Sequence, residues 1–215
     1  MNWRKLFGAA TLLALATGCG EQAGDVEEQM DAPAAPGGED AGPPVVWVRV
    51  LVTHRADGTG NALWTPLFTG EVLRAAQKAV VGQVRFELVG YEAQLDDTLY
   101  ALPQLQLLYR VLLKLRERGI LTMVVSGEET TDSAGVSTIG WELAPVVVMR
   151  ARETDWGPWT ARATAEILLH EMGHQMGLRH TAQPLIGLPW TTDSYWGAPE
   201  GLVYLATWAA ALAKE

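Results

Sequence analysis

Three of the four histidines of this 215-residue chain lie within eleven residues, at His170, His174 and His180. Residues four apart on an α-helix share one face, so His170 and His174 would present their imidazoles side by side. In a continuous helix His180 would lie roughly 15 Å beyond His170 and roughly 80° off that face. Gly177 stands between the second and third histidines, and glycine readily adopts the left-handed conformation that ends many helices. The spacing therefore predicts a helix that ends near Gly177, and a turn that brings His180 back.

These histidines have the donor chemistry of a metal site. Imidazole nitrogens bind Zn²⁺ at about 2.0–2.1 Å, and three neutral ligands leave a fourth position open to water, as in catalytic zinc sites. Glu171 lies about 100° round the helix from His170, so it misses the ion but can reach a water molecule beside it. We therefore expect Zn²⁺ as cofactor, held by His170, His174 and His180, with Glu171 as the catalytic general base.

The segment from His170 to His180 matches all five fixed positions of H-E-x-x-H-x-x-G-x-x-H, the zinc-binding consensus of the metzincin metallopeptidases. From residue frequencies, a chance match in such a chain is on the order of one in a hundred thousand. Thr181 after the last histidine makes the segment most similar to the matrixin branch. The resemblance implies an α/β (α+β) metzincin-like catalytic domain with a twisted, mostly parallel sheet, an edge strand, a zinc-site helix and a C-terminal helix. It also implies a zinc metalloendopeptidase, a hydrolase with protein or peptide substrates.

Hydrophobic patterning predicts alternating strands and helices from about Val45 onward. Runs rich in β-branched residues predict strands over residues 45–53, 84–89, 120–125 and 145–150. Apolar residues at helical spacing predict helices over residues 67–81, 98–118, 159–176 and 199–213. A substrate would extend along an edge strand, for which residues 136–141 and 145–149 are the candidates; the alternative for both is plain loop packing.

The chain departs from the metzincin pattern at one point. Metzincins carry a methionine in a tight turn after the third histidine, whereas the last methionine here is Met176. Leu188 could fill that apolar position, or the turn could lie at residues 191–195. The departure leaves a second function open, a non-catalytic zinc-binding surface lipoprotein that uses a metzincin fold for adhesion or binding. A structural lipoprotein without metal would require the motif to be accidental.

Three further residues have both a functional and a structural interpretation. Tyr195 could assist at the oxyanion, but it is also a plausible half-buried aromatic residue. Glu166, four residues before His170, could orient a zinc ligand or could simply be solvated. His54, at the end of a predicted strand, is expected to be a surface histidine.

The first 44 residues have the composition of a targeting segment rather than of a fold. Residues 1–18 begin with basic residues and continue with a short apolar stretch and small residues, which predicts a signal peptide. Residues 15–19 resemble a bacterial lipobox, so Cys19 is the predicted lipidation site; the alternative is an ordinary secretion signal with an incidental cysteine. Residues 19–44 hold seven acids and no base, which predicts a disordered acidic tether. Residues 45–215 would form the metzincin-like zinc peptidase domain.

This organisation predicts a protein of the bacterial cell envelope, bound to the membrane through a lipid anchor. Gly20 after the cysteine favours the outer membrane by resemblance to other lipoproteins, and without acylation the chain would be secreted. The net charge of −9 argues against a nucleic-acid partner, because phosphate binding needs clustered basic residues. Since the tether holds seven of the 25 acids, the charge says little about the substrate. The sequence gives no indication of the oligomeric state.

Overall fold

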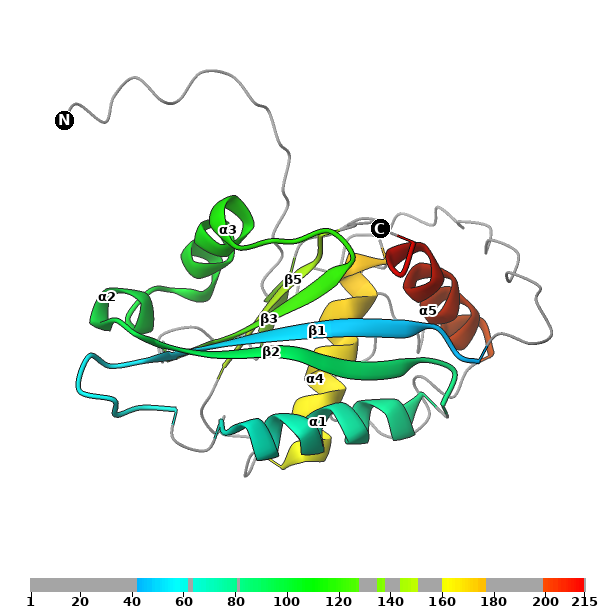
Figure 1. Ribbon diagram of the computed structural model, residues 1–215, viewed down its shortest axis with the longest axis horizontal. Helices are drawn as coiled ribbons and strands as arrows, with labels where there is room; N and C mark the ends of the chain where they lie inside the picture. The colour runs from blue at the N-terminus through cyan, green and yellow to red at the C-terminus, as the bar shows by residue number, and fades with distance from the viewer. Residues whose placement is uncertain are drawn as a thin grey trace, which may run out of the picture.

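The computed structural model describes residues 42–61, 64–80, 82–127, 135–137, 144–150, 160–176 and 199–214. Its centre is a five-stranded sheet in the order β2-β1-β3-β5-β4. The strands are β1 (Val45–His54), β2 (Arg85–Leu95), β3 (Ile120–Ser126), β4 (Gly135–Ser137) and β5 (Val146–Arg150). The helices are α1 (Pro66–Ala79), α2 (Asp97–Tyr100), α3 (Gln104–Lys114), α4 (Ala161–Gln175) and α5 (Pro199–Leu212). Figure 1 shows their arrangement.

The sheet is parallel except at one edge, so the predicted mostly parallel sheet is confirmed. β1 pairs in parallel with both β2 and β3, and β3 pairs in parallel with β5. β4 runs antiparallel to β5, with Gly135 opposite Met149 and Ser137 opposite Val147. The inner strands β3 and β5 are nearly continuous runs of buried apolar residues, as is typical of strands covered on both faces.

Helices cover both faces of the sheet. On one face α1, α4 and α5 share a hydrophobic cluster with alternate residues of β1, and on the other α3 packs over β3, β5 and β4. Figure 1 shows α1 and α4 on the side of the sheet opposite α3. The larger cluster includes Val48 and Val50 of β1, and the smaller includes Leu51 of the same strand. This division follows from the two-residue period of a strand, which sends successive side chains to opposite faces.

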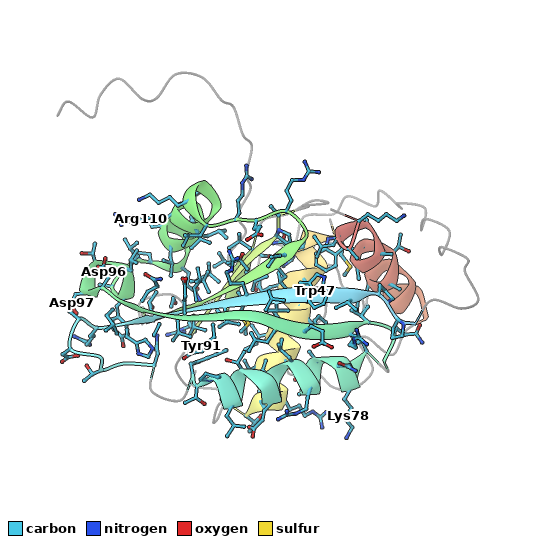
Figure 2. The ribbon with its side chains drawn as sticks, in the orientation of Figure 1. Trp47, Lys78, Tyr91, Asp96, Asp97 and Arg110 are labelled. Carbon is cyan, nitrogen blue, oxygen red and sulfur yellow. The ribbon has the colours of Figure 1, made fainter. Side chains whose placement is uncertain are left out.

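A hydrogen bond joins β2 to the residues just before α1. The hydroxyl group of Tyr91 donates to the main-chain carbonyl of Trp64, just before that helix begins. Figure 2 shows Tyr91 between β2 and α1. Burial raises the pKa of the Tyr91 hydroxyl, because the ionised form is less well solvated there.

The prediction of one long helix over residues 98–118 is wrong. The structure has a short helix, α2, and then α3, which starts after Pro103 and ends at Lys114. Proline disfavours the helical conformation in the residue before it and lacks a main-chain donor, so the leucine periodicity could not continue through it. Asp96 caps α2, and the main-chain N–H groups of Leu99 and Thr98 hold the pKa of its carboxyl group below its usual value.

The other predicted elements are confirmed with shifted ends. The strand predicted over residues 84–89 continues to Leu95 past an irregularity in its pairing with β1. The helices predicted over residues 67–81, 159–176 and 199–213 correspond to α1, α4 and α5. Among the described residues, none of the helices combines the length and the apolar character that crossing a bilayer requires. The predicted signal peptide, Cys19 and nearly all of the tether lie outside the described residues.

Two glycines make room for the ring of Tyr100, which is buried at the end of α2. A Cβ atom added at Gly127 would lie well inside van der Waals distance of that ring, and one added at Gly60 would also overlap it. The guanidinium of Arg55 lies over the same ring, 5.0 Å from its centroid. The ring therefore fixes the turn after β1, α2 and the end of β3 against one another.

Gly127→Ala should lower the free energy of unfolding by about 1–3 kcal/mol, because overpacking a filled interior forces side chains and backbone apart. Urea denaturation of the two proteins would measure this loss. Gly82→Ala is the control, since a Cβ there meets nothing within 4 Å and bears only the strain of a positive φ, about 1 kcal/mol. A loss for Gly127→Ala smaller than that for Gly82→Ala would contradict this account of the Tyr100 packing.

Candidate metal centre

The helix α4 carries the first two histidines of the motif. It begins after Thr160, whose side-chain oxygen accepts a hydrogen bond from the main-chain N–H of Ala163, as at many helix N-termini. Its residues are buried almost without interruption from Thr164 to Gln175. Such burial on all sides indicates a helix enclosed by other elements, so polar side chains near its end are surrounded by protein rather than by solvent.

His170 and His174 lie side by side near the C-terminal end of α4. Their ring centroids are 4.9 Å apart and the ring planes meet at 89°. The two residues are only 4% and 2% exposed. One zinc ion bound by both rings at about 2.1 Å, with near-tetrahedral angles, would hold the ring centres roughly 5 Å apart. The spacing and the nitrogen donors of this pair therefore fit a zinc ion.

Glu171 is the most deeply buried carboxylate of α4, with 1% of its surface exposed. The hydroxyl oxygen of Ser137 lies 2.9 Å from its Oε2 atom and 3.0 Å from its main-chain carbonyl oxygen. Ser137 is itself 2% exposed and belongs to the edge strand β4. The carboxylate therefore points to the edge of the sheet rather than away from the protein, and the Ser137 hydroxyl group is a hydrogen-bond donor to it there.

Further contacts fix the end of α4 against the sheet and the core. The side-chain amide of Gln175 donates to the main-chain carbonyl of Val146 at 2.9 Å, which joins α4 to the start of β5. Met172 and Met176 are fully buried in the larger hydrophobic cluster and so belong to the core. The helix is thus attached on one side through polar groups and on another through apolar packing, which restricts rotation of the histidine pair.

The third predicted ligand lies outside the described residues, as do Gly177, Leu188 and Tyr195. In the part of the chain that is described, no group of three or more histidine, cysteine, aspartate or glutamate side chains is placed to hold a metal ion. The predicted set divides accordingly: His170 and His174 come together, and the contribution of His180 stays a prediction.

The structure also describes two other candidate residues, Glu166 and His54, through their contacts with neighbouring protein groups. Glu166 forms an ion pair with Arg162 one turn away, at 3.1 Å, and its side chain is 25% exposed. His54 is half-buried rather than on the open surface, and its Nδ1 donates to the main-chain carbonyl of Gly60 at 2.8 Å. It helps to close the turn after β1.

The prediction that residues 145–149 form an edge strand for substrate is wrong. The strand at residues 145–149 corresponds to β5, which lies between β3 and β4 and has both neighbours in place. Its main-chain groups already pair, so it cannot accept another extended chain. The other candidate, residues 136–141, overlaps the edge strand β4 at Val136 and Ser137, and residues 138–141 lie outside the described residues.

The contact of Gly135 and Ser137 with Glu171 could not be predicted from the motif. From the sequence, Gly135 and its neighbours are predicted to belong to a polar, glycine-rich loop. The available signal is the Gly-Val-Ser pattern: a buried apolar residue flanked by two small ones suits a strand with one face on the core and another against a closely packed helix.

Comparisons with known proteins give partial structural likenesses only. Neither a protein-family model nor a curated protein sequence matches the chain. Metalloproteinase-II from Bacteroides fragilis aligns with a TM-score of 0.45 at 12% identity, covering 76% of this chain and 53% of that one. An archaemetzincin from Methanopyrus kandleri aligns with a TM-score of 0.44 at 17% identity, covering 79% of this chain and 94% of that one. A zinc-dependent peptidase from Methanocorpusculum labreanum aligns with a TM-score of 0.34 at 13% identity, covering 63% of this chain and 84% of that one. The chain thus spans about half the length of the Bacteroides protein.

Proposed function

We propose that this chain is a zinc-dependent endopeptidase that hydrolyses peptide bonds of extracytoplasmic proteins, on a metzincin-like domain. One observation carries the proposal: two buried imidazoles lie 4.9 Å apart on one helix, and the residue after the first is a buried glutamate. Burial of a carboxylate is unfavourable unless other groups compensate for it, so this arrangement is costly as a purely structural device. It is the arrangement that metal-assisted hydrolysis needs.

His170 and His174 would hold the ion, and the motif assigns the third ligand to His180. When bound, Zn²⁺ supplies a Lewis acid that polarises the scissile carbonyl group and makes water more acidic. The two imidazoles must be neutral to bind it.

Glu171 would move the proton. Its carboxylate accepts a proton from the water molecule that attacks the carbonyl carbon, and then donates it to the nitrogen of the leaving amine as the C–N bond breaks. Proton transfer in both directions requires a carboxylate held in one place. The enclosure of Glu171 against β4 supports this assignment, because a side chain with 1% exposure has few alternative positions.

The protein is expected to contain about one zinc per chain and to cleave members of a peptide library, and a chelator should abolish the cleavage. Added zinc should restore it, because the ligands survive removal of the ion. Metal analysis and mass spectrometry of the digest would measure both. Zinc without any cleavage would overturn the peptidase and favour a non-catalytic zinc-binding module. Absence of zinc as well would overturn the metal site.

The lipid anchor completes the proposal. Acylation of Cys19 would hold the domain at a membrane of the bacterial cell envelope, with residues 19–44 as a tether between the lipid and the domain. The support for this is the sequence pattern alone: a basic start, a short apolar stretch and a cysteine after small residues. The tether would allow the peptidase to reach substrates away from the membrane surface.

A further inference from the structure

The edge strand β4 presents two small residues to α4 and one apolar residue to the opposite face. Gly135 and Ser137 are two apart, so they lie on the same face of the strand, and both contact Glu171. Val136 lies between them and belongs to the hydrophobic cluster under α3. Strand alternation therefore places this pair against Glu171 as long as Val136 stays in that cluster.

Ser137 supplies a directed hydrogen bond to the carboxylate. Its hydroxyl group has a single proton, and two oxygen atoms of Glu171 lie within reach, at 2.9 Å and 3.0 Å. The carboxylate oxygen is the stronger acceptor when Glu171 is ionised, because a hydrogen bond to a charged group is roughly twice as strong as a neutral one. The bond is buried, so water competes with it weakly.

Gly135 supplies space for the same carboxylate. A Cβ atom built on this glycine would lie 2.8 Å from Oε1 of Glu171 and 2.9 Å from its Cγ atom. The end of the glutamate side chain therefore lies directly over the glycine α-carbon. Because the obstructed group is a side chain rather than backbone, an alanine at this position would displace the carboxylate before it displaced the strand.

We propose that β4 fixes the position of the catalytic carboxylate: Ser137 is a positioning residue that orients Glu171 for proton transfer, and Gly135 keeps that orientation sterically open. The proposal rests on the proposed peptidase function. It gives the edge strand a role besides any contact with substrate, because one carboxylate oxygen is held by a hydroxyl group and the other lies over a residue that has no side chain.

Three variants of the zinc-loaded full chain test the proposal. Ser137→Ala and Gly135→Ala should each lower kcat about 10- to 100-fold, the usual effect of removing a group that orients an active-site residue. KM and zinc content should stay unchanged, because neither residue is a proposed ligand. Ser137→Thr should recover most of kcat, since it restores the hydroxyl group. Crystal structures of the alanine variants should show the Glu171 carboxylate displaced from its wild-type position.

Two substitutions serve as matched controls. Ser126→Ala removes another fully buried serine hydroxyl, on β3, which has no hydrogen-bond partner among the described residues. Gly90→Ala adds a methyl group within a strand at ordinary contact distance from Arg49. Both should leave kcat near the wild-type value, so that a loss in the β4 variants is not a general effect of changing a small residue within a strand.

The possible outcomes distinguish failure of the positioning role of β4 from failure of the proposed peptidase function. If wild-type protein cleaves but Ser137→Ala and Gly135→Ala keep its kcat, the role of β4 is overturned and the peptidase stands. If the β4 variants change KM or zinc content instead of kcat, the positioning role is also overturned. If wild-type protein cleaves nothing, the peptidase fails and the role of β4 fails with it. A fall in kcat with rescue by Ser137→Thr and a displaced carboxylate supports the proposal.

Discussion

Glu171→Ala is expected to reduce peptide cleavage by about 10²- to 10⁴-fold while the protein keeps its zinc, because general acid–base catalysis typically contributes that factor. The side chain is not a proposed ligand, so metal content should remain near one per chain. Removing a buried carboxyl group removes its desolvation cost but also opens a cavity, and we therefore expect the unfolding temperature to change little. Steady-state kinetics, metal analysis and a thermal melt on the same preparation would measure the three quantities.

Glu166→Ala is the matched control for this experiment. It makes the same substitution in the same helix, but at a residue paired with Arg162 on the solvent side. A partly exposed pair of this kind is worth little, so activity and zinc content should both stay close to wild type. If Glu171→Ala retained full activity, or if it lost zinc together with activity, the general-base assignment would be wrong.

His174→Ala should abolish both zinc binding and cleavage. Removing one of two adjoining imidazoles leaves the ion with too few protein ligands, and the substitution opens a cavity in a helix that is buried on nearly all sides. Wild-type protein at a zinc concentration about 1,000 times its Kd should gain roughly 4 kcal/mol of stability from the ion. The variant should gain none, which a thermal melt with and without zinc would show.

His54→Ala separates this effect from the loss of any histidine. His54 lies at the end of β1 and bonds the main chain of Gly60, outside α4. Its substitution should lower stability modestly, since one hydrogen bond contributes about 0.5–1.5 kcal/mol. Zinc-induced stabilisation should persist in full. Retention of zinc by His174→Ala, or its loss in His54→Ala, would contradict the proposed ligand set.

The sequence predicts the strands and the zinc-site helix because local patterns determine them. β-Branched runs gave β1, β3 and β5, and helical spacing gave α4 with the histidine pair on one face. The leucine repeat over residues 98–118 misled for a local reason too, since Pro103 overrides periodicity. Local rules therefore account for most of the helices and strands, and the break at Pro103 follows from the same rules once the effect of proline on a helix is included.

The surroundings of Glu171 could not be predicted in this way. Ser137 is 34 residues from Glu171 in the sequence, and their contact depends on β4 taking the edge position beside β5. No pattern within the motif reports which strand will lie there. For the same reason residues 145–149 could not be recognised as an inner strand, because a short apolar run suits either place in a sheet.

The pairing of β4 with β5 also makes the surroundings of Glu171 depend on the assembled sheet. β4 precedes β5 in the chain, yet among the described strands β5 is its only partner, and β5 in turn rests on β3. If β5 has not joined β3, β4 has no partner strand, and Glu171 would then lack both the Ser137 hydroxyl group and the space over Gly135. The surroundings of Glu171 are therefore expected to form only after the sheet has assembled from β3 through β5 to β4.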